Sequence, residues 1–271
     1  MEPFRGVEIV RVRAGSREAA IDRAATEEPL EIRLHGRPFA VIMRTPGADL
    51  ELAAGFLLAE RVIRTADDLG AIEHCRDESS AGAENVVNVT LDGAAAASLD
   101  AVLAGRRQIA VSASCGLCGR LAIDSLRVDV PPIESAWTVT RALLAELPHR
   151  LRDAQAVFDE TGGLHAAGLF TRDGRLAASA EDVGRHNAVD KVIGKRLLAD
   201  ALPLSDSMLF VSGRTSYEIV QKAALAGVPI LAAVSAPSSL AIDLARDTGI
   251  TLAGFVRDGA FNLYSHPSRV E

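Results

Sequence analysis

Residues 207–256 have the sequence SMLFVSGRTSYEIVQKAALAGVPILAAVSAPSSLAIDLARDTGITLAGFV, in which short apolar runs alternate with longer mixed segments. The apolar runs at 207–211, 228–234 and 250–256 have the length of buried strands. The segments between them, 215–226 and 238–247, have the length of helices. Because strands that alternate with helices form parallel sheets, this stretch predicts an α/β layer with parallel strands.

The predicted layer extends toward both ends of the chain. Two apolar runs, 164–170 and 175–179, flank the turn sequence RDG at 172–174 and predict a hairpin. The segments that complete the layer are a helix over 140–158 kinked at Pro148, a helix over 186–200 and an edge strand at 262–264.

The first half of the chain predicts a smaller set of mixed helices and strands. Apolar and polar residues alternate on both sides of HGRP at 35–38, so residues 30–45 predict a second hairpin. Asp49 is expected to cap a helix that ends near Arg61. Further elements expected here are a strand at 86–91, an alanine-rich helix at 94–105 and a short strand at 108–111.

Pro131 and Pro132 interrupt regular structure and mark the preferred linker. We therefore expect an α+β domain over residues 1–135, with a pair of cysteines near its end, and an α/β domain over residues 136–271.

The charge balance limits the classes of partner. The chain has 29 basic and 36 acidic side chains, a net charge of −7, which argues against a sequence-independent grip on nucleic acid. No stretch approaches the roughly 20 apolar residues that cross a bilayer, and the first residues lack the apolar core of a signal peptide. We expect a cytoplasmic protein without a membrane anchor.

Two serine-rich loops follow predicted strands at the edge where parallel sheets bind ligands. One contains Ser212, Gly213 and Arg214, and the other begins at Ser235. Hydroxyl groups, backbone N–H groups and an arginine at helix starts suit a phosphate. The alternative is that these serines only cap the helices that follow, and the sequence leaves both readings open.

The segment EDVGRHNAVDK at 181–191 places many polar side chains at a predicted loop-to-helix junction. It is either a solvated helix start capped by Asp182 or Asn187, or an acid, base or anion site that uses Arg185 and His186. His165, in the apolar segment TGGLHAAG, is expected to be a hydrogen-bonded core residue.

The segment SCGLCG at 114–119 contains the pair Cys115 and Cys118. Such a pair is half of a zinc site, a dithiol that cycles with a disulfide, or a nucleophile with a neighbour. Structural zinc needs four ligands. His74, Cys75 and His165 are poor candidates for the remaining ligands, because His74 and Cys75 are adjacent in the sequence. Three cysteines do not form a disulfide framework, which favours reactive thiols in a reducing compartment.

Read together, five segments resemble the FdhD family, the sulfurtransferase-type accessory proteins of formate dehydrogenases. The segments are SCGLCG, TGGLHAA, EDVGRHNAVDK, VSGRTSYEIVQK at 211–222 and SAPSSLA at 235–241. Their order and spacing are similar to that family from about residue 30 to the end. The resemblance implies a second domain with a cytidine-deaminase-like three-layer fold.

The resemblance also implies a function. A member of this family takes sulfur from a cysteine desulfurase as a cysteine persulfide, and passes it to the bis-molybdopterin guanine dinucleotide molybdenum cofactor used by formate dehydrogenase. The persulfide is placed on Cys115 or Cys118, with Cys115 as the main carrier, and a homodimer is expected. A guanine nucleotide pocket would use Phe255, Val256, Arg257, Asp258, Gly259 and Ala260, beside Ser212, Gly213, Arg214, Ser235 and His186.

Two alternatives accompany this hypothesis. The first is a chaperone that binds the molybdenum cofactor without carrying sulfur. The second is a zinc deaminase, whose signature is His-x-Glu followed by Pro-Cys-x-x-Cys. His165 is followed by two alanines, no proline precedes Cys115, and the cysteines come before the histidine, so the sequence argues against deaminase chemistry.

Overall fold

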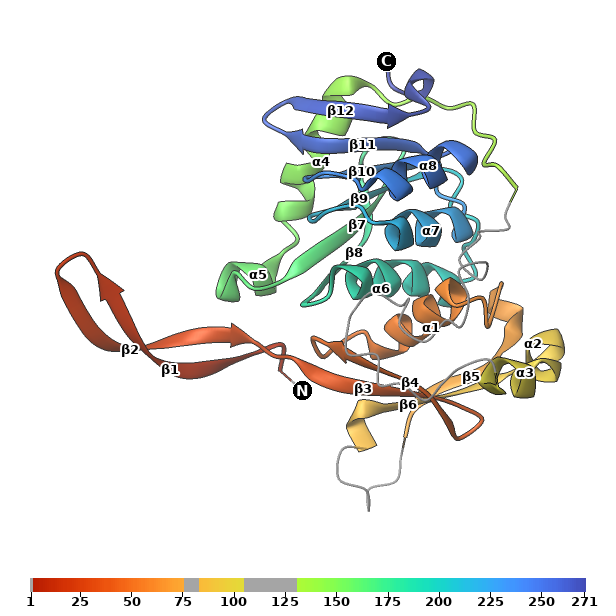
Figure 1. Cartoon of the computed structure of the whole chain (residues 1–271), viewed down its shortest axis with the longest axis horizontal. Coiled ribbons are helices and arrows are strands. Elements are labelled where there is room, and N and C mark those ends of the chain that lie inside the picture. Colours follow the sequence, from red (N-terminus) through yellow and green to blue (C-terminus); the bar gives the residue numbers. More distant parts are fainter. Residues whose placement is uncertain (1, 76–82, 105–130) are drawn as a thin grey trace.

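The computed structural model describes residues 2–75, 83–104 and 131–271. Three sheets organise this part of the chain: a two-stranded ribbon, a four-stranded sheet and a six-stranded sheet. Figure 1 shows the six-stranded sheet with helices on both faces, the four-stranded sheet beside it, and the ribbon projecting away from both. Within the described ranges, every helix is too short or too polar to cross a bilayer.

The six-stranded sheet has the order β12-β11-β10-β9-β7-β8. The central strands β9, β10 and β11 are parallel, as the sequence predicts, and antiparallel strands complete both sides. The bounds are β7 His165–Thr171, β8 Leu176–Asp182, β9 Ser207–Val211, β10 Ile230–Ala233, β11 Thr251–Arg257 and β12 Ala260–Ser265. The predicted hairpin and final edge strand are therefore confirmed.

Helices cover both faces of this sheet because its strands are apolar on both sides. In β9, Met208 and Phe210 pack into the cluster on one face, and Leu209 and Val211 pack into the cluster on the other. One face carries α4, and the opposite face carries α6, α7 and α8 (Figure 1). Their bounds are α4 Arg141–Arg152, α6 Arg185–Leu198, α7 Tyr217–Leu225 and α8 Ser239–Asp247.

The four-stranded sheet has the order β4-β3-β6-β5, with β3 and β6 parallel. The predicted hairpin over 30–45 and the strand at 86–91 are confirmed. The bounds are β3 Glu28–Leu34, β4 Arg37–Arg44, β5 Leu69–His74, β6 Val86–Leu91, α1 Asp49–Ala59, α2 Gly93–Ala97 and α3 Leu99–Ala104, with 3-10 turns at Ala66–Asp68 and Ala83–Asn85.

Helix α1 joins the two parts of the chain by direct contact with α6. A Cβ atom on Gly194 of α6 would lie 1.8 Å from the carbonyl oxygen of Glu51, and one on Gly55 of α1 would lie 2.0 Å from that of Asp190. The two backbones therefore touch, which only glycine permits. One apolar cluster contains residues from both halves, and the division at residue 135 stays a prediction.

Three sequence expectations need correction. Asp49 is not the cap of α1, because Ala48 occupies that position and the Asp49 carboxylate pairs with Arg44 instead. The expected helix over 140–158 is two helices, α4 and α5 (Ala156–Thr161), and Pro148 lies inside α4 without ending it. The alanine-rich helix is likewise divided into α2 and α3. The strand expected at 108–111 lies outside the described residues.

The ribbon was not predicted from the sequence. Strand β1 (Phe4–Arg13) pairs with β2 (Ser16–Ala25) in antiparallel register along their full lengths. Figure 1 shows it extending far from the rest of the molecule. Its strands carry charged residues on both faces, so the alternation that marks a half-buried strand is weak.

Candidate functional site

Several elements bring polar groups to one edge of the six-stranded sheet. The parallel strands β9 and β10 end there. Because β7 runs antiparallel to β9, and β8 to β7, His165 at the start of β7 and Asp182 at the end of β8 lie at the same edge. Helices α6, α7 and α8 begin there, so their positive ends converge.

The two serine loops are joined to each other and to β7. The Ser212 hydroxyl accepts a hydrogen bond from the Ala166 N–H at 2.8 Å, and the Ser212 N–H donates to the Ala166 carbonyl. The backbone N–H of Thr215 donates to the Ala236 carbonyl at 3.2 Å, and the backbone carbonyl of Thr215 accepts from the Ser238 N–H at 3.0 Å. Ser238 also caps α8, so the capping interpretation is correct for that serine.

Gly213 brings the first loop close to an imidazole and a guanidinium side chain. A Cβ atom at this position would lie 3.3 Å from His165 Nδ1 and 3.6 Å from Arg185 Cδ. Gly213 itself is buried, whereas Arg214 beside it is exposed. The absence of a side chain at Gly213 thus leaves the backbone directly accessible to the His165 ring.

His165 is not the core residue that the sequence suggested. It is half-buried at the sheet edge. Burial lowers the pKa of its imidazole, and the nearby Arg185, His186 and Arg214 lower it further, while Asp182 acts in the opposite direction. The ring is therefore neutral near pH 7 and can accept or donate a hydrogen bond without adding charge.

A prediction follows from this pKa. A histidine whose pKa is lower in the folded than in the unfolded state binds fewer protons when folded, so acid favours unfolding. The free energy of unfolding should fall as pH drops below about 6.5, and His165→Gln should weaken that fall. Urea titrations between about pH 7.5 and 5.5 measure it.

His149→Gln, at an exposed position of α4, is the histidine substitution with which His165→Gln is compared. A profile that is the same in His165→Gln and the unmodified chain would contradict the assignment.

His186 is buried and held by α7. Its Nε2 lies 2.8 Å from Glu218 Oε2 and 2.9 Å from Ser216 Oγ. Only 3% of His186 is exposed. A carboxylate can only accept, so it holds the proton on Nε2 and leaves Nδ1 for another partner. This is the arrangement by which a carboxylate orients a functional histidine.

Three buried polar atoms here have no hydrogen-bond partner within residues 2–75, 83–104 and 131–271. They are His186 Nδ1, Arg185 Nε and Thr215 Oγ1. A buried polar group without a partner costs about 1–3 kcal/mol, so such groups in a native protein call for an explanation. A polar, anionic group bound at this edge would supply the missing partners.

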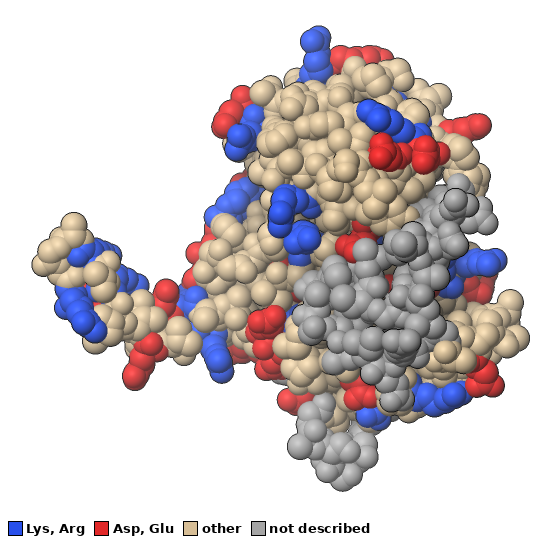
Figure 2. Space-filling model, viewed as in Figure 1, with Lys and Arg blue, Asp and Glu red and all other residues tan. Residues whose placement is uncertain are grey.

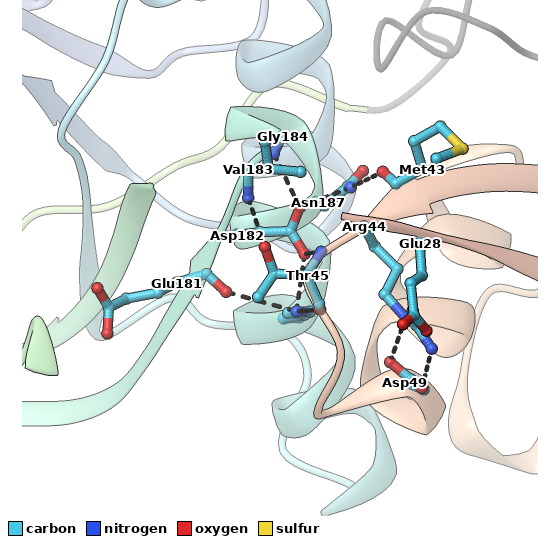
Figure 3. Close-up of polar contacts among 11 residues, drawn as sticks. Glu28, Met43, Arg44, Thr45, Asp49, Glu181, Asp182, Val183, Gly184 and Asn187 are labelled. Carbon is cyan, nitrogen blue, oxygen red and sulfur yellow. Dashed lines mark hydrogen bonds and ion pairs between the residues drawn. The ribbon is translucent and has the colours of Figure 1, made fainter. Parts of the chain in front are cut away.

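Most of the segment 181–191 serves a different purpose, as Figure 3 shows. Asp182 is fully buried, and its carboxylate lies 2.7 Å from Lys191 Nζ. It also accepts hydrogen bonds from the N–H groups of Gly184 and Thr45 and from the Asn187 side chain.

These contacts connect α6 to the segment after β4. Lys191 donates to the Thr45 carbonyl at 2.8 Å, and Asn187 donates to the Met43 carbonyl at 2.8 Å (Figure 3). Neither Asp182 nor Asn187 caps α6, because Gly184 occupies the cap position and has no side chain to act there. Asp182, Asn187 and Lys191 therefore form a buried network with the segment after β4. His186 instead contacts Ser216 and Glu218.

The network predicts a large loss of stability when one charge is removed. Lys191→Met leaves the Asp182 carboxylate buried without its cation, which should lower the free energy of unfolding by about 3–5 kcal/mol. Urea titration checks this value. Lys195→Met, on an exposed position of the same helix, is the matched control and should change it by less than about 0.5 kcal/mol. Equal effects in the two variants would contradict the role given to Lys191.

The segment 255–260 is only partly near this edge. The Phe255 N–H donates to the Ser235 carbonyl at 3.2 Å, so these two residues are adjacent. Val256 is buried in the cluster on the α4 face. Arg257 pairs with Ala260 across a turn in which Asp258 and Gly259 have φ of 52° and 76°. A guanine pocket built from this segment stays a prediction.

Cys115 and Cys118 lie outside the described residues. Cys75, at the end of β5, is partly exposed and not in a disulfide. Within the described part of the chain, no three histidine, cysteine or acidic residues form a group that could hold a metal ion.

Two members of the site escaped the sequence analysis. Glu218 resembles any acidic residue in the first turn of a helix, a position where carboxylates are common. Thr215 resembles a loop hydroxyl. Only the packing of α7 against α6 brings Glu218 to His186 and shows that both are buried.

Comparison with known proteins agrees with the resemblance. A relative named sulfur carrier protein FdhD, from Streptomyces coelicolor, is 50% identical over 272 residues, covering 97% of this chain and 94% of its own. Another of that name, from Anaeromyxobacter dehalogenans, is 51% identical over 258 residues, covering 93% and 90%.

One solved structure agrees with the fold over its full length. The crystal structure of a candidate formate dehydrogenase accessory protein from Desulfotalea psychrophila covers 100% of both chains, with a TM-score of 0.79 and 26% identity. A guanine deaminase from Nitrosomonas europaea covers 50% of this chain with 18% identity and a TM-score of 0.34, a score too low to compare activities.

The model of the FdhD/NarQ family matches residues 25–271. It includes all five segments on which the resemblance rests. This chain therefore belongs to the FdhD/NarQ family.

Proposed function

We propose that this chain is a sulfur carrier that supplies sulfur to the molybdenum cofactor of a formate dehydrogenase. The observation that carries the proposal is the match to the FdhD/NarQ family over residues 25–271, together with relatives at about half identity that bear the name sulfur carrier protein. The pair Cys115 and Cys118 supplies the thiols that such chemistry needs.

The first step loads the carrier. The Cys115 thiolate attacks the outer sulfur of a persulfide on a cysteine desulfurase, a bond forms between the two sulfurs, and the desulfurase thiolate leaves. The result is a persulfide on Cys115, with no net oxidation or reduction. The thiolate is required because the neutral thiol is a poor nucleophile.

The second step releases the sulfur. Attack of the Cys118 thiolate on the inner sulfur forms a Cys115–Cys118 disulfide and frees the outer sulfur as hydrosulfide, so the thiol pair provides two electrons. The acceptor is the bis-molybdopterin guanine dinucleotide form of the cofactor. A cellular dithiol then reduces the disulfide and returns the carrier to its starting state.

The polar sheet edge is the proposed binding place for the acceptor. Phosphate or pyrophosphate oxygens would accept hydrogen bonds from Arg185 and the Thr215 hydroxyl, at the converging helix starts. Exposed Arg214 adds a cation, and Ser235 with Phe255 borders the same edge. A free guanine nucleotide would compete for this place.

A second candidate function is a chaperone that binds and delivers the cofactor without carrying sulfur. It is favoured by one observation, namely that, among the residues the structure describes, the contacts of the polar edge are made by residues 165–255. In this case the cysteines serve structure or docking.

Transfer itself is the direct test. The chain, loaded by a desulfurase with radiolabelled cysteine and freed from donor, is mixed with unsulfurated cofactor and a formate dehydrogenase. The carrier function predicts that label moves to the cofactor fraction as dehydrogenase activity appears. Label that stays on the chain while activity appears would support the chaperone instead.

A further inference from the structure

His186 at the start of α6 has one ring nitrogen that is bound and one that is not. Its Nε2 contacts Glu218 Oε2 at 2.8 Å and Ser216 Oγ at 2.9 Å, and the ring is almost fully buried. Because a carboxylate only accepts hydrogen bonds, the proton on Nε2 points to Glu218. Nδ1 is equally buried, and no group in the described part of the chain bonds to it. A bound ligand must therefore decide whether Nδ1 donates or accepts.

The charges at the sheet edge favour an anionic ligand. Arg185 in the first turn of α6 and the exposed Arg214 both act on the His165 ring, as does His186, so these side chains lie near one another. The chain as a whole has a net charge of −7, and Figure 2 shows acidic and basic side chains in small, scattered groups over the visible face of the body. A few positioned groups, and not a general attraction, must therefore hold the anion.

The other charged groups packed around α6 form pairs among themselves. Asp182, at the end of β8, lies 2.7 Å from Lys191 Nζ, and Asp190 lies 2.5 Å from Lys222 Nζ of α7. Burial raises the pKa of the Asp190 carboxyl, Lys222 lowers it, and Glu60 at the end of α1 acts together with burial. The carboxylate beside the imidazole has no such lysine partner within the described ranges.

An anion beside Nδ1 requires a second proton on the His186 ring. The oxygens of a phosphate accept, as Glu218 does, so a neutral imidazole with a single N–H can donate to only one of the two. A neutral ring would also hold two negative charges on its opposite sides in a buried place, which is unfavourable. The imidazolium donates from both nitrogens and places a positive charge between the carboxylate and the anion.

We propose that the acceptor's pyrophosphate binds with the uptake of one proton, which His186 holds on Nδ1 and Glu218 stabilises. The inference rests on the binding place proposed above for the acceptor, and it adds that the affinity of this place depends on pH. The complex holds one more proton than its separate parts at about pH 7 to 8, where an ordinary imidazole is neutral. Binding must therefore weaken as the pH rises. His186 contacts the ligand, and Glu218 is a positioning residue that acts through it.

Calorimetric titration of the full chain with diguanosine pyrophosphate tests the proposal. No group of this probe titrates near neutral pH, so the protons taken up belong to the protein. The dissociation constant should rise about tenfold from about pH 7 to pH 8, and buffers of different ionisation enthalpy should reveal an uptake of about one proton. His186→Gln should bind more weakly and take up no proton, because an amide donates without one. Glu218→Gln should lower both the affinity and the uptake.

His149→Gln is the matched control, because His149 is exposed on α4, on the opposite face of the sheet, and this variant should retain the affinity and uptake of the unmodified chain. If His186→Gln misfolds, NMR of isotope-labelled histidine rings in the unmodified chain decides, since one ring should gain a proton when the probe is added. A dissociation constant that is the same at both pH values, uptake that His186→Gln retains, or uptake that His165→Gln abolishes would overturn the inference and leave the binding place intact. No binding at either pH would overturn the binding place, and the inference with it.

Discussion

Replacement of both Cys115 and Cys118 by serine should reduce the activation of formate dehydrogenase at least about 100-fold in cells that lack the chromosomal gene for this protein. A serine hydroxyl is not acidic enough to act as the nucleophile at neutral pH, and it cannot hold a second sulfur as a persulfide. The measurement is formate oxidation in extracts of the complemented cells, at matched levels of the carrier.

Cys75 provides the control for this experiment. It is a partly exposed, free cysteine outside the pair, so Cys75→Ser should preserve activation. Activation that survives the double serine substitution would contradict sulfur carriage and favour the cofactor chaperone. The proposed binding of guanine nucleotide at the polar sheet edge, measured on the double variant, distinguishes loss of chemistry from loss of structure.

A Gly194→Ala substitution should lower the free energy of unfolding by more than about 3 kcal/mol. The new methyl group would lie 1.8 Å from the Glu51 carbonyl oxygen and 2.7 Å from the backbone nitrogen of Gly55. Both are backbone atoms, so helices α1 and α6 must separate, and the apolar cluster that spans them must open. Urea titration, or the amount of soluble chain, measures the loss.

Gly163→Ala is the matched control, because its added Cβ would meet no atom closer than 3.7 Å. It should change the free energy of unfolding by less than about 0.5 kcal/mol. Similar stabilities of Gly194→Ala and Gly163→Ala would show that α1 and α6 do not touch as the structure has them.

The central sheet was predictable because its signals are local. Strands β9, β10 and β11 are continuous apolar runs separated by helices, and this periodicity is visible in any short window. The β1–β2 ribbon was not predictable from the same rule. A ribbon that contacts its own chain only at its base has almost no buried face, so its sequence does not alternate clearly.

The segment 181–191 shows the limit for polar residues. Its many polar side chains marked the segment as important. Yet Thr45, which contacts both Asp182 and Lys191, lies 137 and 146 positions before them in the chain. Sequence alone could not distinguish a solvated helix start from a buried network, since the distinction depends on which element covers α6. Tertiary packing decides this.

The candidate site was likewise predicted in part. Ser212, Gly213 and Arg214 were found from their place after a strand, and the structure brings Gly213 next to His165 and Arg185. The burial of His186 against Glu218 depends on how α7 sits on α6, so no sequence rule gives it. The spacing of the cysteines suggested thiol chemistry, and the family match supplied its purpose.

The most direct test of sulfur carriage is mass spectrometry of the intact chain after treatment with a cysteine desulfurase and cysteine. Sulfur carriage on Cys115 predicts that the unmodified chain and Cys118→Ala each gain the mass of one sulfur atom, that a thiol reductant removes it, and that Cys115→Ala gains none. Loading of Cys115→Ala, or of the variant with both cysteines replaced, to the level of the unmodified chain would contradict it.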